Sequence, residues 1–254
     1  MKLIVQSALA VVFCGIGLSA NAQGMDTIRR KDANGWDFLQ VRKSNGSVVA
    51  EGYKHNGIME GTWVNFHENG IPLYVANFRN GIRNGVYMQI NQNGCTEMVE
   101  NYRDGMLEGP RRTYQLGTGF INEEGYFSEG KKHGMYNKRY PSGRPQEEAS
   151  YNMGKRDGKS TWYFEDGRKA ADYNYRNDMI DGEAAIYHKS GKVSEFGLYK
   201  NNEQTGLWKE FYENGNMKAE GKYENGKKEG AWKEYNEDGK LVKTVKYKNG
   251  EVVK

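Results

Sequence analysis

The sequence predicts an all-β chain, an elongated antiparallel β-meander of about nine hairpin repeats of 24 residues. One observation is a set of glycines spaced 24 or 25 residues apart, at Gly61, Gly85, Gly109, Gly134, Gly158, Gly182, Gly206 and Gly230. The other is the frequency of Asn-Gly and Asp-Gly pairs between runs of about six strand-forming residues, the strongest short-range signal for hairpins. No segment after residue 22 keeps a helical period over ten residues without Gly.

The N-terminal segment has the pattern of an export signal. A short basic start precedes an apolar run over 3–18, and Ala20 and Ala22 match the small-residue pattern at which signal peptides are cleaved. We expect cleavage after Ala22 and a periplasmic, extracellular or cell-surface location. The predicted organisation is residues 1–22 as a signal peptide, 23–35 as a short flexible leader and 36–254 as the repeat array.

Each repeat is expected to contain two strands and two tight turns. Nine residues after most leading glycines a second Gly follows, and seventeen residues after them an aromatic residue, as in Tyr199 and Tyr223. On this alignment the first unit contributes Tyr53 and the third contributes Tyr126. Each of these two units has one residue more than the regular repeat, and we expect the additional residue in the turn that follows Tyr53 or Tyr126. The complete array is expected to contain about 18 strands.

Aromatic residues recur at two further positions, two and five residues after the leading Gly. An offset of three along a strand places these two sets on opposite faces of the sheet. Tyr223 and Trp232 are nine residues apart across an Asn-Gly turn, so we expect them on one face, where they could lie directly opposite each other. The candidate binding residues are this aromatic ladder: Trp63, Tyr87, Trp208, Trp232, Tyr199 and Tyr223. Either the coiled sheet buries one ladder, or a face stays open for a partner.

The unit Tyr-x-x-Gly-x-x-x-Gly-x-Trp-x-x-Tyr-x-x-x-Gly resembles the MORN-repeat variant in its 24-residue bacterial form, most closely over 206–215 and 223–232. The sequence departs from this pattern at Arg111, Ser160 and Ala184, which lack the aromatic, and at Asp178 and Asn202, which lack the turn Gly. The resemblance implies an elongated meander that serves as a scaffold for proteins or phospholipids. It supplies no catalytic residues, and relatives often carry the label of toxin–antitoxin antitoxin.

Composition excludes several classes of protein. The chain has 37 basic and 33 acidic residues, too small an excess for a nucleic-acid-binding polycation. Its two cysteines, Cys14 and Cys95, cannot form a disulfide framework after cleavage. The four histidines are scattered, and Cys95 shows no pattern of a nucleophile with a base. Recurring carboxylates are better explained as cross-strand partners of Lys than as Ca²⁺ ligands: Glu51, Glu123, Glu148, Asp172 and Glu220. We therefore expect no catalytic site, cofactor or metal.

The sequence leaves several functions open. We favour an exported, non-catalytic scaffold of the cell envelope that binds another protein. One alternative is a glycan-binding module in which exposed Trp63, Trp208 and Trp232 stack on sugars, which fails if coiling buries them. Others are an antitoxin-like or immunity-like binding protein and a periplasmic hydrolase, which needs a polar pocket that the repeats do not supply. The expected partner is a protein, with a glycan or lipid headgroup as alternatives and no nucleic acid, and the oligomeric state stays open.

Overall fold

The computed structural model describes residues 24–253 and confirms the predicted all-β meander. One antiparallel sheet contains 21 strands in the described part of the chain. Their bounds are β1 Met25–Lys31, β2 Trp36–Lys43, β3 Val48–His55, β4 Ile58–Phe66, β5 Pro72–Arg79, β6 Ile82–Ile90, β7 Thr96–Arg103, β8 Met106–Leu107, β9 Gly109–Tyr114, β10 Ile121–Ser128, β11 Lys131–Arg139, β12 Pro145–Asn152, β13 Lys155–Tyr163, β14 Lys169–Arg176, β15 Met179–Tyr187, β16 Val193–Lys200, β17 Glu203–Phe211, β18 Met217–Glu224, β19 Lys227–Tyr235, β20 Leu241–Lys248 and β21 Glu251–Val252.

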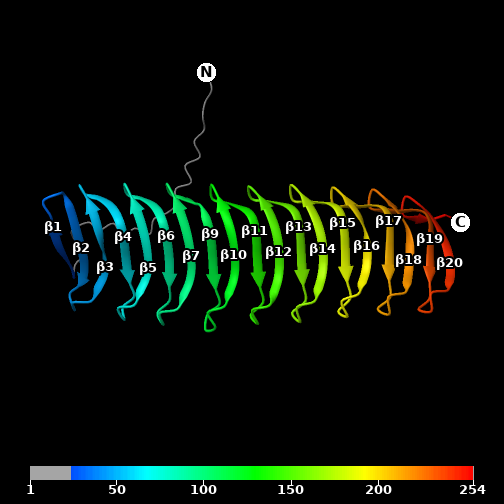
Figure 1. The fold of residues 1–254 in the computed structure, drawn as a ribbon, viewed down its shortest axis with the longest axis horizontal. Coiled ribbons are helices and arrows are strands. Elements are labelled where there is room, and N and C mark those ends of the chain that lie inside the picture. The colour runs from blue at the N-terminus through cyan, green and yellow to red at the C-terminus, as the bar shows by residue number, and fades with distance from the viewer. Residues whose placement is uncertain (1–23, 254) are drawn as a thin grey trace, which may run out of the picture.

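The strands follow one another in chain order along the long axis of the molecule, from β1 at the blue end to β20 at the red end (Figure 1). Each full-length strand pairs with the strands that precede and follow it in sequence, and β7 pairs with both β8 and β9. The predicted signal peptide, residues 1–22, lies outside the described residues.

The segment predicted as a flexible leader contains a strand. Residues Met25–Lys31 form β1, which pairs with β2 over seven residues, from Met25 opposite Lys43 to Lys31 opposite Asp37. Arg29 donates to the buried carboxylate of Asp37 at 2.5 Å. The sequence prediction missed this strand because it lacks the glycine spacing of the repeats, and the ion pair helps to attach it to the sheet.

Nine hairpins of the array close through two-residue turns in which both central residues have positive φ, the geometry of a type I′ turn. Asn225 and Gly226 are typical, with φ of 49° and 73°. Asp178 and Asn202 have φ of 71° and 69° although they replace Gly. Asn and Asp tolerate this conformation, so the two departures from the family pattern leave the turn type unchanged.

The leading glycine of each repeat is a β-bulge. All eight have positive φ, and the register of each hairpin shifts beside them, as between Glu220 and Lys222 opposite Gly230. A bulge with Gly in the left-handed region inserts an unpaired residue and increases the local twist. One consequence is that Tyr223 pairs directly with Lys228 rather than with Trp232, which corrects the simplest form of the sequence prediction.

The positions of the two extra residues were predicted wrongly. The turns after β3 and β10 have the usual two residues, and the longer connection lies between β9 and β10. The aromatic of the third unit is therefore the buried Phe127, whereas Tyr126 is exposed. In the first unit Lys54 occupies this position, and Tyr53 is exposed on the other face.

Hydrogen bonds also join neighbouring repeats on the two sides of the sheet where the strands are connected. On the side of the type I′ turns, the backbone N–H of Gly226 donates to the carbonyl of Gln204 at 3.0 Å. On the side of the longer connections, the Tyr212 hydroxyl donates to the carbonyl of Tyr235 at 2.8 Å, and Nε2 of His188 lies 2.9 Å from the carbonyl of Phe211. The array therefore gains stability from contacts between adjacent repeats, as expected of a solenoid-like protein.

Candidate interaction surfaces

One face of the sheet, here called the tryptophan face, carries Trp63, Trp208 and Trp232. Its central row alternates large and small residues on neighbouring strands. Three close pairs place a tryptophan against a glycine: Gly52 with Trp63, Gly197 with Trp208 and Gly221 with Trp232. Gly125 faces Tyr136 and Ala76 faces Tyr87 in the same way. Small residues are therefore required beside the aromatics because the rings lie flat across the neighbouring strand.

Trp208 and Trp232 are held in equivalent positions. A Cβ added to Gly221 would lie 2.3 Å from the Trp232 ring, and one added to Gly197 would lie 2.3 Å from the Trp208 ring. The indole N–H of Trp232 donates to the carbonyl of Lys222 at 3.1 Å, and that of Trp208 donates to Leu198 at 3.1 Å. The two side chains are only 1% and 2% exposed. They form the core of the C-terminal repeats.

The structure brings four of the six predicted ladder residues into one stack. Ring centroids are 5.3 Å apart for Tyr199 and Trp208, 5.8 Å for Trp208 and Tyr223, and 5.1 Å for Tyr223 and Trp232, each pair edge to face. Such geometry is favourable for aromatic rings. Burial raises the pKa values of Tyr199 and Tyr223. The predicted same-face contact across the turn is thus confirmed, although the bulge prevents direct pairing.

The other two predicted residues, Trp63 and Tyr87, belong to a second cluster at the N-terminal end. Trp63 packs there with Val41, Ala50 and Ala76, and Tyr87 lies against it. Arg83 lies over the Tyr87 ring at 4.4 Å, a cation–π distance. Burial raises the pKa of Tyr87.

The three repeats that lack the aromatic compensate in different ways. Arg111 forms an ion pair with the buried Glu100 at 2.8 Å. Tyr173 lies directly opposite both Ser160 and Ala184, on the strands to either side. One tyrosine on the intervening strand thus replaces the two missing aromatics, and the row stays packed.

Burial of the tryptophans overturns one sequence hypothesis. Trp63, Trp208 and Trp232 were expected to be exposed for a glycan-binding role, but each is less than 9% exposed. A sugar can stack only on a ring face that solvent reaches. Packing against neighbouring glycines and aromatic rings buries Trp63, Trp208 and Trp232, so these three residues are core side chains and not a sugar platform.

The opposite face has its own continuous central row, in which each residue lies directly opposite the next on the neighbouring strand. From β3 to β20 the row is Glu51, Val64, Val75, Met88, Val99, Arg112, Glu124, Asn137, Glu148, Thr161, Asp172, Ala185, Phe196, Lys209, Glu220, Lys233 and Thr244. Its character changes along the molecule. The N-terminal repeats contribute aliphatic residues, and most later repeats contribute polar or charged ones.

Other side chains on this face donate hydrogen bonds to the carboxylates in the polar part of the row. The Tyr163 hydroxyl donates to Glu148 at 2.7 Å, and burial together with this bond raises the pKa of Tyr163 to about 12. Tyr187 donates to Asp172 at 3.1 Å, which also accepts from Lys169 at 3.0 Å. The predicted cross-strand pairing of recurring carboxylates with Lys is confirmed at Asp172, which lies 3.4 Å from Lys159 on β13, and at Glu220, which lies 3.6 Å from Lys233 on β19. Glu148 accepts from tyrosine instead.

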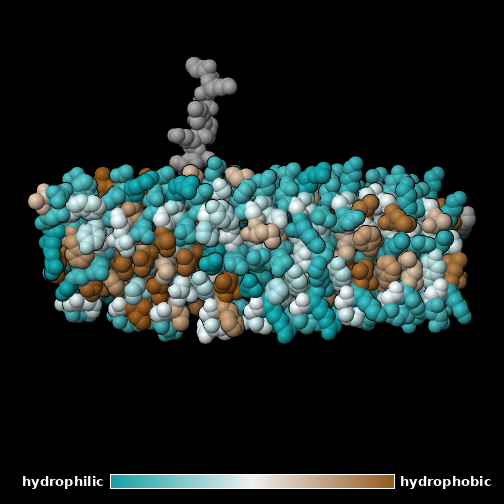
Figure 2. Space-filling view, viewed as in Figure 1, coloured by the Kyte–Doolittle hydropathy of each residue, from teal (hydrophilic) through white to brown (hydrophobic). Residues whose placement is uncertain are grey.

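The aliphatic part of the row is the centre of an apolar patch on β4–β7. We define the apolar patch by Val64, Val75, Met88 and Val99. Around it the same face carries Ile58, Ile82, Val86 and Met106, which are between 39% and 53% exposed, and the half-buried Phe66 and Ile90. Figure 2 shows hydrophobic residues gathered over β4–β7 and a mostly hydrophilic surface over β11–β14.

This surface was not among the sequence predictions, although the sequence contains a signal for it. The patch residues lie three and fourteen residues after the leading glycines, and later repeats place Glu148, Asp172 and Glu220 at the second of these positions. A comparison of repeats at these two positions would have found it. The predicted binding residues were all aromatic, whereas the repeats differ here in valine and methionine.

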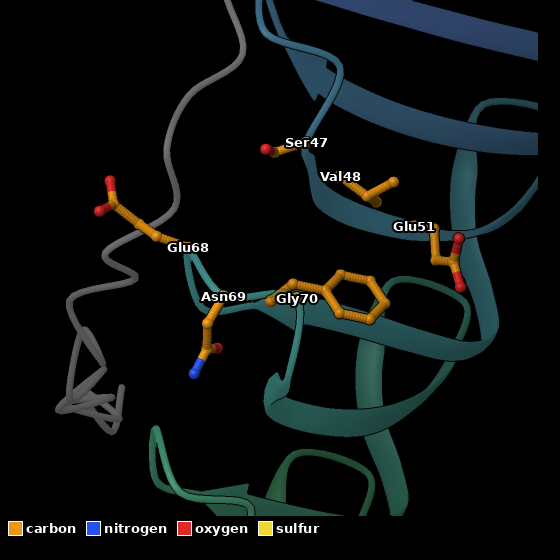
Figure 3. A pocket seen from close by; sticks show the side chains of 7 residues that line it. Ser47, Val48, Glu51, Glu68, Asn69 and Gly70 are labelled. Carbon is orange, nitrogen blue, oxygen red and sulfur yellow. The ribbon is translucent and has the colours of Figure 1, made fainter.

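A shallow pocket of about 320 Å³ borders the apolar patch between the β2–β3 and β4–β5 connections. Ser47, Val48, Glu51, Phe66 and Glu68 contribute to its lining, and the two glutamates lie at opposite ends (Figure 3). Gln40 already donates to Glu51 at 2.8 Å, and Lys43 pairs with Glu68 at 2.6 Å. The carboxylates are therefore too separate to act as a pair.

Among the described residues, 24–253, no group of three or more His, Cys, Asp or Glu side chains could hold a metal ion. Cys95 is exposed. Over the same residues, no helix has the length and apolar character needed to span a bilayer.

Comparison with protein families supports the repeat assignment. Four segments match the family model of the MORN repeat variant: residues 59–80, 156–177, 204–225 and 228–249. The last two include Trp208 and Trp232 with their partner tyrosines. The comparison with curated proteins gave no match.

Proposed function

Because the chain belongs to the MORN repeat variant family, we propose that it is an exported, non-catalytic scaffold that binds a protein in the cell envelope through the apolar patch. The observation that carries this proposal is the difference between the two faces. The tryptophan face uses its large apolar side chains for its own core. The opposite face leaves aliphatic side chains on four neighbouring strands without a covering layer.

The position of the apolar patch supports a binding role over a purely structural one. Val64, Val75, Met88 and Val99 lie on consecutive strands, so they form one continuous row and not scattered surface residues. The four side chains are half-buried, and the exposed Ile58, Ile82, Val86 and Met106 lie around them on the same face. Single exposed apolar residues need no explanation, whereas contiguous apolar patches at the surface mark interaction sites. Ion pairs and tyrosine hydrogen bonds occupy the same row farther along the sheet, so the repeat itself does not require aliphatic residues there.

A pair of variants in the same row tests the proposal. Met88→Glu places a charge at the centre of the apolar patch, and Thr244→Glu places the same charge on exposed β20 of the same face. Tagged protein is crosslinked in cells, and the recovered material is analysed for proteins and glycans. We expect one dominant protein with the unchanged chain and with Thr244→Glu, and at least a tenfold loss with Met88→Glu.

Circular dichroism of both variants controls for folding. Equal recovery from the two folded variants, or recovery of glycan without protein, would contradict the proposal.

A further inference from the structure

We propose that the apolar patch binds the apolar patch of a second copy of this chain, related by a two-fold axis parallel to the strands that passes between Val75 and Met88. The inference rests on the proposed function, since it names the partner of the same surface. It follows from the order of residues in the central row and from the charges at the two ends of that order.

The row is complementary to itself when its direction is reversed. Over six neighbouring strands its order is Glu51, Val64, Val75, Met88, Val99 and Arg112. The two-fold axis places Val75 of one copy opposite Met88 of the other. It also places Val64 opposite Val99. A two-fold contact requires such self-complementarity, because the same patch is used by both copies.

The ends of the row carry opposite charges. Reversal brings Glu51 of each copy opposite Arg112 of the other, so the arrangement contains two equivalent ion pairs. Each group has an alternative contact within its own chain: Gln40 donates to Glu51, and Arg112 lies 3.5 Å from Glu124. If the rows of the two copies ran in the same direction, Glu51 would lie opposite Glu51 and Arg112 opposite Arg112. Like charges opposite each other are unfavourable, so the charges favour rows that run in opposite directions.

The exposed side chains beside the row are compatible with this reversal. Ile58 and Ile82 lie on alternate strands, β4 and β6, next to the type I′ turns. Reversal places them beside β7 and β5 of the other copy, where the matching positions are Arg103 and Arg79. The alkyl stems of arginine can cover an aliphatic side chain while the guanidinium remains in water.

The area of the contact between the two copies determines the affinity that we expect for the dimer. Six strands about 4.8 Å apart, in contact over about six residues each, cover roughly 600 Å² per copy. The total is near the lower limit for a specific protein interface, about 1,200 Å². We therefore expect a reversible dimer with a dissociation constant on the order of micromolar, and not a permanent one.

Charge reversal tests both the contact and its orientation. Analytical ultracentrifugation of the purified protein compares the unchanged chain with Glu51→Arg, Arg112→Glu and the double variant. We expect each single variant to weaken dimerisation at least tenfold, and the double variant to restore it to within about threefold. Lys233→Glu, in the same row outside the apolar patch, is the control and leaves the dissociation constant unchanged.

Disulfide trapping adds a measurement that does not depend on these charges. In a Cys95→Ser background, a Val75→Cys chain is mixed with a differently tagged Met88→Cys chain and oxidised. The mixed disulfide is expected to exceed that formed by a Lys233→Cys and Thr244→Cys mixture at least fivefold. Equal yields would overturn the proposed axis.

The outcomes separate this inference from the proposed function. A monomer at every concentration up to about 1 mM, or a double variant no better than the single ones, overturns the two-fold dimer. If Met88→Glu still abolishes recovery of a different protein, the scaffold function stands with another partner. If the Met88→Glu variant is also without effect, both proposals fail.

Discussion

Gly221 is the most direct place to test the packing of the tryptophan face. An alanine Cβ at this position would lie 2.3 Å from Cδ2 of Trp232 and 2.4 Å from Cε2 and Cγ. Real Cβ atoms do not approach so closely, so the indole must move. The ring is 1% exposed, packs edge to face on Tyr223 and donates to the carbonyl of Lys222, and each of these contacts opposes that movement.

The expected cost of Gly221→Ala is about 2 kcal/mol in the free energy of unfolding, within the range for overpacking a core. Trp232→Tyr alone should also cost about 2 kcal/mol, because it leaves part of the buried ring volume empty. Combined, the two changes should cost about 2 kcal/mol and not their sum. The chain already uses this combination, since Ala76 lies opposite Tyr87.

Urea unfolding followed by far-UV circular dichroism measures the four free energies of this cycle. Lys222→Ala, at an exposed neighbour of Gly221, is the matched control and should change stability by less than about 0.5 kcal/mol. Coupling of at least about 1 kcal/mol is expected for residues in direct contact. Additive effects, or a Gly221→Ala variant as stable as the unchanged chain, would refute the account of small residues beside large rings.

Four further predictions follow from single sites. Met153 has φ of 46° in a type I′ turn, so Met153→Asn should stabilise the chain by about 1 kcal/mol in urea unfolding, and a loss would argue against that turn geometry. Burial and a hydrogen bond to Glu100 raise the pKa of Tyr102 to about 12. Its contribution to stability is therefore complete below pH 10 and is lost as pH rises through 12. In a titration of tyrosinate absorbance, Tyr102→Phe should reduce the amplitude of this late step by one tyrosine, because Tyr163 titrates in the same range. Arg111→Leu leaves Glu100 buried without its ion pair and should cost about 3 kcal/mol, while Arg111→Tyr with Glu100→Ala should recover most of it in the same assay. Cys95→Ser should change neither stability nor partner recovery, because the thiol is exposed at a turn, and a loss of recovery would indicate a role for the thiol.

Most of the fold could be predicted because its main determinants are local. A 24-residue glycine spacing with Asn-Gly turns specifies hairpins without any knowledge of distant contacts. The bulges could not be predicted so easily. A glycine such as Gly230 would be assigned to a turn from its residue type alone. Only the strand pairing shows that it lies inside β19, where the bulge changes the register so that Trp232 is not directly opposite Tyr223. Strand β1 was missed because its attachment through Arg29 and Asp37 is a tertiary contact.

The candidate site was predicted less well than the fold. Alternation along the strands correctly separated the two aromatic sets, but alternation does not say which face is buried. The answer depends on how closely the Trp208 and Trp232 rings approach Gly197 and Gly221, which is a property of three-dimensional packing. The apolar patch depends on a departure from the repeat average at Val75 and Met88 and their neighbours, so averaging over repeats conceals it.

Site-specific photocrosslinking in cells tests most directly whether the opposite face, and not the tryptophan face, binds the partner. A photoreactive amino acid replaces Met88 in the apolar patch, Tyr199 in the aromatic ladder or Thr244 in the polar part of the opposite face. We expect a strong protein adduct from position 88, whether with a second copy or another protein, and only background from positions 199 and 244. Adducts concentrated at position 199 would contradict it, because the ladder would then be the binding surface.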